Sequence, residues 1–278
     1  MLVDRKPRIY KPRAHTVVLD RAHPLANGLV FATLMEGPFG FEYVNGFHGI
    51  PSSGSTLPSA AATNEPGHGV GLSEGNGVAG QCLKFSQTVS DAPYNGAITV
   101  SIRGSIVSNS SYRMLMTKVS GNGATNSTFE FRCNPSNVLE MLDPTLTHGA
   151  NTVSAGLHTL GFAGLRNNTN NGNFYIDGIS DTGNIPNYSG PSGTSNTKPI
   201  LIGERDDATG FSANGTWLCA YIWKRELSTA EMLWIHQEPY AFFRPITIPH
   251  VMTTSVAGPA FQAAWAVRKN QAFQGWTS

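Results

Sequence analysis

Residues 223–245 read WKRELSTAEMLWIHQEPYAFFRP and contain the clearest helical signal in the chain. Ser228 and Glu231 have the spacing of a capping box, in which each side chain accepts a hydrogen bond from the backbone N–H of the other residue. Pro239 ends the helix, because its ring disfavours the helical conformation of the residue before it. The stretch therefore predicts one short helix over residues 228–237.

The apolar residues of the same stretch indicate how this helix packs. Leu227 and Met232 occupy the two positions of a hydrophobic staple, which fixes the direction in which the chain enters the helix. His236 lies four residues after Met232 and three after Leu233. We therefore expect these side chains to share the inward face of the helix.

The chain before this helix consists of short apolar runs separated by turn-forming Gly, Ser, Asn and Thr. Runs of this length with recurring turns predict strands. The expected strands are residues 28–35, 81–87, 97–107, 112–119, 128–134, 138–142, 158–165, 173–179, 199–204 and 215–227. Because no helices alternate with them, the pattern favours an antiparallel sandwich or jelly roll over a parallel α/β fold.

Composition excludes several classes of protein. Charged residues are 13% of the 278 residues, against about 25% in ordinary globular domains. A net charge of +1 gives no global field for binding polyanions. No apolar run is long enough for a transmembrane helix, so we expect no membrane partner. Cys82, Cys133 and Cys219 are far apart and are expected to be buried thiols.

The chain divides into three segments by composition. Residues 1–24 are expected to form an extended basic arm, and residues 25–243 the folded body. Residues 244–278 are expected to form an extended tail, rich in proline and aromatic residues. Large aromatic side chains are badly solvated when exposed, so the tail should lie on a surface, either of its own domain or of a neighbouring protein.

The body resembles the laminin-G-like, concanavalin-A-like jelly-roll family. The resemblance rests on HPLANGLVFATLMEGPFG (23–40), on GQCLKFSQ, on GLHTLGFAG followed by NFYIDGIS, and on the block from PILIGERD to EPYAFFRP. It implies an all-β sandwich in which the last strand leads into a short capped helix at one end of the sheets.

The ending EPYAFFRP is similar to domains of structural proteins in tailed bacteriophages. That similarity implies a non-enzymatic virion protein, either a capsid decoration or a cementing protein. Its partners would be other virion proteins, namely the major capsid protein or tail proteins, and it would form a homo-oligomer in the particle. One alternative is a tail-fibre or receptor-binding component that binds cell-surface glycans. A third is a polysaccharide-degrading enzyme.

The two end segments contain the residue types expected to bind such partners. Cations can pair with acidic surfaces or phosphates, and large aromatic residues dominate interface energies. The candidates are Arg5, Lys6, Arg8, Lys11 and Arg13 in the arm, and Phe261, Trp265, Phe273 and Trp276 in the tail.

No pair of carboxylates has the spacing expected of a glycosidase. Glu140 and Asp143 are the nearest match. Three residues apart on a strand, they point to opposite faces, whereas glycosidic chemistry needs two carboxyl groups on one face. We therefore expect no enzymatic activity.

Ligand sites in the loops are predicted from residue type alone. The carbohydrate-binding candidates, which could equally be packing residues, are Tyr43, Phe47, Tyr94, Tyr188 and Phe211. We expect no cofactor. Calcium is the alternative, with the hard ligands Asp177, Glu204, Asp206 and Asp207. Asp177 followed by Gly178 also predicts a hairpin turn.

Overall fold

The computed structural model describes residues 11–36, 39–51, 59–62, 70–74, 82–85, 97–107, 112–118, 129–143, 145–165, 172–181, 199–203 and 215–246. Residues up to Pro245 form one compact unit, and residues 246–278 form another. Only Ile246 of the second unit belongs to the described residues.

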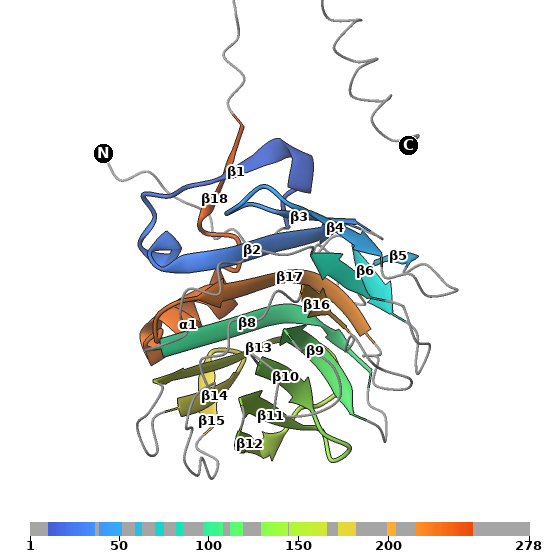
Figure 1. The fold of residues 1–278 in the computed structure, drawn as a ribbon, viewed down its shortest axis with the longest axis vertical. Coiled ribbons are helices and arrows are strands. Elements are labelled where there is room, and N and C mark those ends of the chain that lie inside the picture. The colour runs from blue at the N-terminus through green and yellow to red at the C-terminus, as the bar shows by residue number, and fades with distance from the viewer. Residues whose placement is uncertain are drawn as a thin grey trace, which may run out of the picture. The chain divides into compact units, whose positions relative to one another are not determined.

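The first unit is a sandwich of antiparallel strands (Figure 1). In pairing order, the first layer contains β12 (Thr145–Thr152), β11 (Val138–Asp143), β10 (Phe129–Cys133), β9 (Arg113–Lys118), β16 (Ile200–Ile202), β7 (Leu83–Phe85) and β4 (His48–Pro51). In the same order, the second contains β2 (Leu29–Glu36), β17 (Gly215–Trp223), β8 (Ala97–Ile106), β13 (Gly156–Leu165), β14 (Gly172–Ile176) and β15 (Ile179–Asp181).

Short strands join and extend these layers. β3 (Phe39–Glu42) pairs with both β2 and β4, so the two layers are one continuous hydrogen-bonded path. β5 (Ser59–Ala62) and β6 (Val70–Glu74) pair with each other, and β6 also pairs with the start of β17. The predicted all-β jelly-roll sandwich is therefore confirmed.

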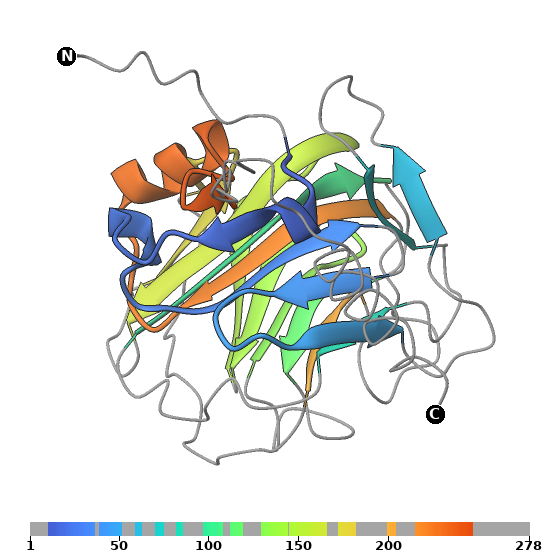
Figure 2. The same cartoon turned by 90° about the horizontal axis from the view of Figure 1, so that it is seen from above.

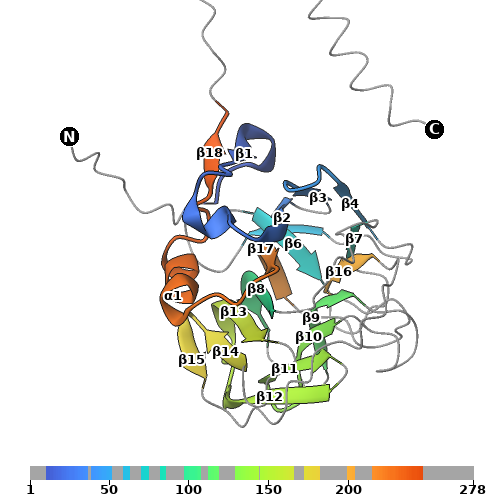
Figure 3. The same cartoon turned by 60° about the vertical axis from the view of Figure 1, so that its left-hand side comes forward.

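The main core lies between the two layers. Phe131 and Met141 of the first layer and Val100, Ile102 and Phe162 of the second are fully buried there. Figure 3 shows the two sets of strands facing each other around this core. Along β8, these core residues alternate with polar residues that face the other side of the second layer.

The other side of the second layer is also covered, and this explains why β17 is apolar on both faces. A second apolar cluster contains Cys219, Tyr221 and Trp223 of β17, packed against Leu25 and Ile235. Helix α1 (Thr229–Gln237) and the N-terminal segment supply its cover, and Figure 2 shows both lying over this side of the sheet.

The far ends of the strand path, β12 and β15, are tied together by one buried side chain. Asp181 of β15 accepts hydrogen bonds from the backbone N–H groups of Ala150 and Asn151 in β12, at 3.0–3.2 Å. The side-chain amide of Asn151 donates a further bond of 2.8 Å. Asp181 is 2% exposed, so these bonds replace the water that the carboxylate would otherwise hold.

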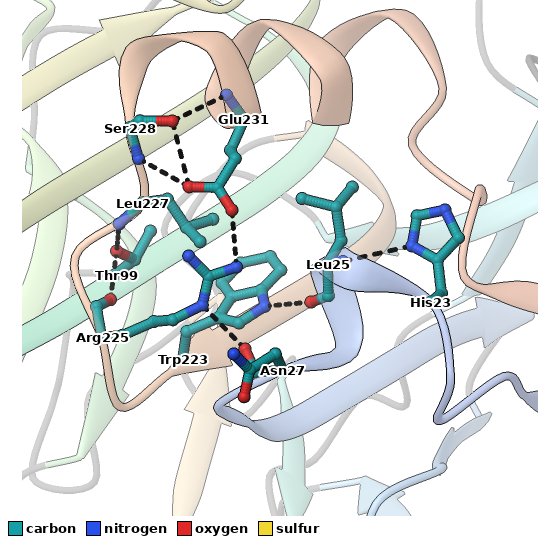
Figure 4. Close-up of polar contacts among 9 residues, drawn as sticks. All are labelled: His23, Leu25, Asn27, Thr99, Trp223, Arg225, Leu227, Ser228 and Glu231. Atoms are coloured by element: carbon teal, nitrogen blue, oxygen red, sulfur yellow. Dashed lines mark hydrogen bonds and ion pairs between the residues drawn. The ribbon is translucent and has the colours of Figure 1, made fainter.

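Helix α1 begins at the expected capping box. The Glu231 N–H donates to Ser228 Oγ at 3.3 Å, and the Ser228 N–H donates to Glu231 Oε2 at 2.9 Å (Figure 4). The predicted inward face is wrong in part. Met232 and Ile235 are buried, but Leu233 is 40% exposed, because the helix turns Ile235 rather than Leu233 toward the sheet.

We expect Ser228→Ala to lower the free energy of unfolding by about 1 kcal/mol, because it leaves the Glu231 N–H without its cap. Urea unfolding monitored by circular dichroism measures this. Ser228→Thr retains a capping hydroxyl and should lose much less. Equal unfolding midpoints for Ser228→Ala and the unmodified protein would show that the box does not stabilise the helix.

Candidate attachment site

The N-terminal segment differs from the predicted extended arm of residues 1–24. Residues 14–26 contain two short 3₁₀ helices, Ala14–Thr16 and Pro24–Ala26, with strand β1 (Val17–Leu19) between them. Val17 and Leu25 are buried in the second apolar cluster. This apolar burial, which the basic composition of the segment concealed, fixes the segment on the body.

Polar contacts hold the start of this segment in place. The Ala14 N–H donates to Glu36 Oε1 at 2.6 Å, and the Tyr43 hydroxyl donates to the Ala14 carbonyl. Burial lowers the pKa of Lys11 to about 8, outweighing the attraction of Glu36, which acts to raise it. Residues 11–14 are therefore part of the body.

Strand β1 pairs with a strand that the sequence analysis placed at the boundary of the tail. β18 (Phe243–Pro245) runs antiparallel to β1, with Val17 opposite Pro245 and Leu19 opposite Phe243. The Asp20 N–H extends this contact by donating to the Phe242 carbonyl at 2.8 Å. We call β1 and β18 together the terminal clasp. It brings the two ends of the body to one place.

Aromatic packing forms the base of the clasp and explains the sequence YAFFRP. Phe242 and Phe243 are buried, with ring centroids 4.8 Å from Tyr221 and 4.8 Å from Tyr43, respectively. The Tyr221 hydroxyl donates to the Pro239 carbonyl at 2.7 Å. The chain leaving α1 is therefore drawn over the sheet and into the clasp.

A polar network anchors the next part of the N-terminal segment to the end of β17 (Figure 4). Trp223 Nε1 donates to the Leu25 carbonyl at 2.6 Å. Arg225 donates through Nε to the Asn27 carbonyl at 2.8 Å, and through Nη2 to Glu231 Oε1 at 2.7 Å. One arginine thus links the N-terminal segment to the capping box of α1.

The outward face of the clasp combines positive charge with an apolar residue. Arg244 lies opposite Val18 in the pairing, and both side chains are exposed. Arg13 is also exposed, and the His15 side chain is 72% exposed. Exposed positive charge and an exposed apolar side chain therefore lie at or beside the clasp.

A second cluster surrounds Asp177, the described member of the predicted calcium ligands. Asp177 and Gly178 form the β14–β15 turn with φ of 55° and 77°, as the sequence predicts for a hairpin. Asp177 Oδ2 bonds His158 Nδ1 at 2.8 Å, and its Oδ1 accepts from the Thr159 N–H at 2.8 Å. His236 Nδ1 of α1 lies 3.5 Å from Oδ1.

This cluster joins three elements, β13, the β14–β15 turn and helix α1. The chain of contacts continues from His158 Nε2 to Ser154 Oγ at 3.1 Å, in the order seen in serine hydrolases. A Cβ on Gly178 would lie 2.7 Å from Leu233 Cα, so the turn packs closely on the helix. Within the described residues, no set of three His, Cys, Asp or Glu side chains could hold a metal ion.

Asp177 and His236 of this cluster both have lowered pKa values. Burial acts to raise the pKa of Asp177, but hydrogen bonds from His158 and the Thr159 N–H outweigh it and hold the pKa below its usual value. Burial lowers the pKa of His236, which the attraction of Asp177 only partly offsets, and the charges of Arg103 and His158 lower it further.

We therefore expect acid to weaken the packing of α1 on the turn. A histidine with a lowered pKa in the folded state contributes stability above its unfolded pKa of about 6.5, and this stability is lost as the pH falls below that value. Thermal unfolding at pH 7.5 and 5.5 measures the loss. His236→Gln should lose less on acidification than the unmodified protein. An identical loss in both would exclude His236 as the responsible group.

A third cluster crosses β10 and β11. Arg132 bonds Glu130 Oε2 through Nη1 at 3.1 Å and Glu140 Oε2 through Nε at 2.8 Å. Asn134 donates to Glu140 Oε1 at 3.0 Å, and the Arg132 guanidinium lies 4.6 Å from the Tyr112 ring centroid. Glu130 and Glu140 are buried, and the single guanidinium of Arg132 pairs with both carboxylates.

Of the predicted carbohydrate candidates, the structure describes Tyr43 and Phe47, which both lie between β3 and β4. Tyr43 packs beneath the clasp, and the half-buried Phe47 contributes its carbonyl to a turn, accepting from the Glu42 N–H at 2.8 Å. Lys11 and Arg13 lie at the clasp. The other predicted site residues lie outside the described residues: Arg5, Lys6, Arg8, Tyr94, Tyr188, Glu204, Asp206, Asp207, Phe211, Phe261, Trp265, Phe273 and Trp276.

Sequence reasoning missed the partners that complete these clusters. His158 and His236 are 78 residues apart in the chain, and only the packing of α1 on the β14–β15 turn brings them together. The sequence does contain a signal for the Arg132 ladder. Glu130 and Arg132 alternate along one strand, and Glu140 follows after a short turn, a pattern typical of cross-strand pairs in a hairpin.

Comparison with known proteins shows the fold but no family. No family model matches the sequence, and no curated protein matches it. Among the described residues, no helix has the length and apolar character required to cross a membrane.

Solved structures with the same architecture include an enzyme and two binding domains. Trypanosoma rangeli sialidase in complex with sialic acid matches 81% of this chain with a TM-score of 0.52 and 13% identity. The binding domain of Paraclostridial Mosquitocidal Protein 1 matches 78%, with a TM-score of 0.52 and 14% identity. The binding domain of botulinum neurotoxin DC, solved with rat synaptotagmin II, matches 76%, with a TM-score of 0.55 and 11% identity.

The chain spans 36% of the sialidase and about half of the two binding-domain chains, 53% and 51%. At this level of identity, the comparisons establish the jelly-roll-like β-sandwich fold alone.

Proposed function

We propose that this chain is a non-enzymatic structural protein of a tailed-phage virion, a capsid decoration or cementing protein attached through residues 1–10 and 246–278. The observation that carries the proposal is the terminal clasp, in which Val17 lies opposite Pro245. The similarity of the ending EPYAFFRP to phage structural proteins supports the virion setting.

The clasp brings together the points at which the two end segments leave the body, so the segments can act as one attachment. Ordering a segment on a partner costs about 1–2 kcal/mol per residue in backbone entropy. Once one segment is bound, a second one joined to the body nearby binds at a high effective concentration. The body stays folded throughout, because the clasp belongs to its own hydrogen-bonded structure.

The test is sedimentation of the purified chain with DNA-free heads of the encoding phage. The full chain should co-sediment, and deletion of residues 1–10 or of 246–278 should each reduce occupancy. Both deletions keep the clasp, so their melting temperatures should stay near that of the full chain. Undiminished occupancy with both segments deleted would show that the jelly roll itself is the attachment surface.

The non-enzymatic part of the proposal has its own test. A screen of polysaccharides and activated esters should show no turnover above background. Turnover abolished by Glu140→Gln would identify the ladder as a glycosidic site. Turnover abolished by Ser154→Ala would identify the Asp177 cluster as a hydrolytic site. Either result would overturn the non-enzymatic reading.

Carbohydrate recognition is the second candidate, as in a tail-fibre or receptor-binding component. It is supported by the partly exposed edge of the ladder, which combines the Tyr112 ring with the polar groups of Arg132 and Asn134. Rings and polar side chains of these kinds bind sugars in lectin-like folds. Binding on a glycan array that is lost in Tyr112→Ala, with an unchanged melting temperature, would favour this function.

A further inference from the structure

Ser154, His158 and Asp177 form a hydrogen-bonded chain that the proposed attachment does not use. Ser154 Oγ lies 3.1 Å from His158 Nε2, and His158 Nδ1 lies 2.8 Å from Asp177 Oδ2. Asp177 is held in turn by the Thr159 N–H, which donates to its Oδ1 at 2.8 Å. Ser154 is exposed, whereas the His158 side chain is only 14% exposed. A largely buried base therefore contacts a hydroxyl that outside molecules can reach.

The carboxylate of Asp177 determines which nitrogen of His158 carries the proton. Burial acts to raise the pKa of Asp177, but the bonds from His158 and the Thr159 N–H hold it below its usual value. Asp177 is therefore ionised at neutral pH and can only accept hydrogen bonds. A neutral His158 must then donate through Nδ1, which leaves a lone pair on Nε2 to accept from the Ser154 hydroxyl. In this arrangement a histidine can remove the proton of an attacking serine.

The backbone on either side of Ser154 anchors the residue and leaves space beside the histidine. Val153, directly before it, is buried in the main core. Gly156, which begins β13, has a φ of 136°, a conformation that glycine adopts readily. A Cβ on Gly156 would lie 3.8 Å from His158 Nε2 and, apart from its chain neighbours, within 4 Å of no other described atom. The glycine therefore leaves room for a reacting group next to this nitrogen.

We propose that Ser154 is a site of covalent modification, which accepts an acyl group from an activated ester or thioester with His158 as general base. The bond between Ser154 Oγ and the acyl carbon forms, while the bond between that carbon and its leaving group breaks. The hydroxyl proton passes to His158 Nε2 and from there to the departing alcohol or thiol. This inference goes beyond the proposed attachment and does not depend on it.

The chemistry of these three residues favours a single transfer over repeated turnover. A positioned general base accelerates a reaction by about 10²–10⁴-fold, which is enough for an activated ester or thioester with a good leaving group. The product is an alkyl ester of Ser154, whose leaving group is poor. Enzymes that hydrolyse such an ester also use donors for the charge on its oxygen, and losing one donor costs about 10²–10³-fold. The acyl group should therefore stay on Ser154.

The experiment treats the full chain with a fluorophosphonate probe, which bonds to activated serines with loss of fluoride, and locates the adduct by peptide mass spectrometry. Ser154 should be labelled about a hundredfold faster than Ser136, an exposed serine in the turn between β10 and β11. Ser154→Ala should abolish this adduct, and His158→Gln should slow its formation about a hundredfold. Ser136→Ala should leave it unchanged. With p-nitrophenyl acetate, the chain should release one equivalent of nitrophenol and no more.

The adduct on the unmodified chain is measured directly, so the test does not depend on how well the variants fold. Labelling of Ser154 no faster than that of Ser136 would overturn the proposal. Unchanged labelling in His158→Gln, with an unchanged melting temperature, would exclude the histidine as the base. Repeated release of nitrophenol that Ser154→Ala abolishes would overturn the single transfer and, with it, the non-enzymatic function proposed above.

Discussion

Trp223→Ala is expected to lower the free energy of unfolding by about 3–5 kcal/mol, the cost of removing a large aromatic side chain from a close-packed core. Trp223 is fully buried at the end of β17. Its ring contacts Tyr221 and Phe242, and its Nε1 holds the Leu25 carbonyl at 2.6 Å. The substitution therefore removes packing from the second apolar cluster and releases part of the N-terminal segment.

Chemical denaturation of three variants separates these contributions. Trp223→Phe keeps much of the ring but loses the hydrogen bond, so its effect should be intermediate. Leu233→Ala changes a 40% exposed apolar side chain on the neighbouring helix and should cost little. A loss for Trp223→Ala no larger than that for Leu233→Ala would mean that the cluster over β17 does not stabilise the body.

Asp181→Ala is expected to cost about 1–3 kcal/mol, because it removes the buried acceptor of two backbone N–H groups in β12. The Ala150 and Asn151 N–H groups both depend on this carboxylate. Hydrogen exchange should also quicken in β12, since Asp181 ties that strand to β15. β12 and β15 are the two ends of the hydrogen-bonded strand order. The substitution should therefore increase local opening at these strands as well as lower the free energy of global unfolding.

Asp20 provides the matched control for this substitution. Its Oδ1 accepts from the Ala22 N–H at 3.2 Å in an exposed turn, where water can replace it. Asp20→Ala should therefore change stability by less than about 1 kcal/mol. Two results would contradict the prediction: similar losses of unfolding free energy for the two substitutions, or unchanged hydrogen exchange in β12. Either would show that the contact of Asp181 with β12 does not stabilise the sandwich.

The sequence predicted the helix and the strands whose position is set by residues close together in the chain. The helix was placed correctly because Ser228, Glu231 and Pro239 act within a few residues of one another. Its inward face was misjudged, because the position of the sheet decides whether Leu233 or Ile235 is buried. A strand lies in each of the ten expected ranges, although the range 173–179 runs past the end of β14 into the Asp177–Gly178 turn.

Strands without an apolar run between turns were missed. β12 reads TLTHGANT and shows little apolar alternation, since its pairing with β11 and the tie to Asp181 hold it in place. β1 is three residues long and follows a basic stretch, so its pairing with β18 depends on contacts across almost the whole chain. Because the clasp depends on contacts between distant parts of the chain, it could not be predicted from local sequence patterns.

The terminal clasp also determines how the molecule carries mechanical load. Because β1 and β18 run antiparallel with Val17 opposite Pro245, a pull between the two end segments peels the three residue pairs apart one after another. Peeling breaks hydrogen bonds singly, whereas shear would load them all at once, so the clasp would open under a small force. If one partner holds both end segments, as the proposed attachment requires, that partner bears the pull between them. The jelly roll then carries little of the load.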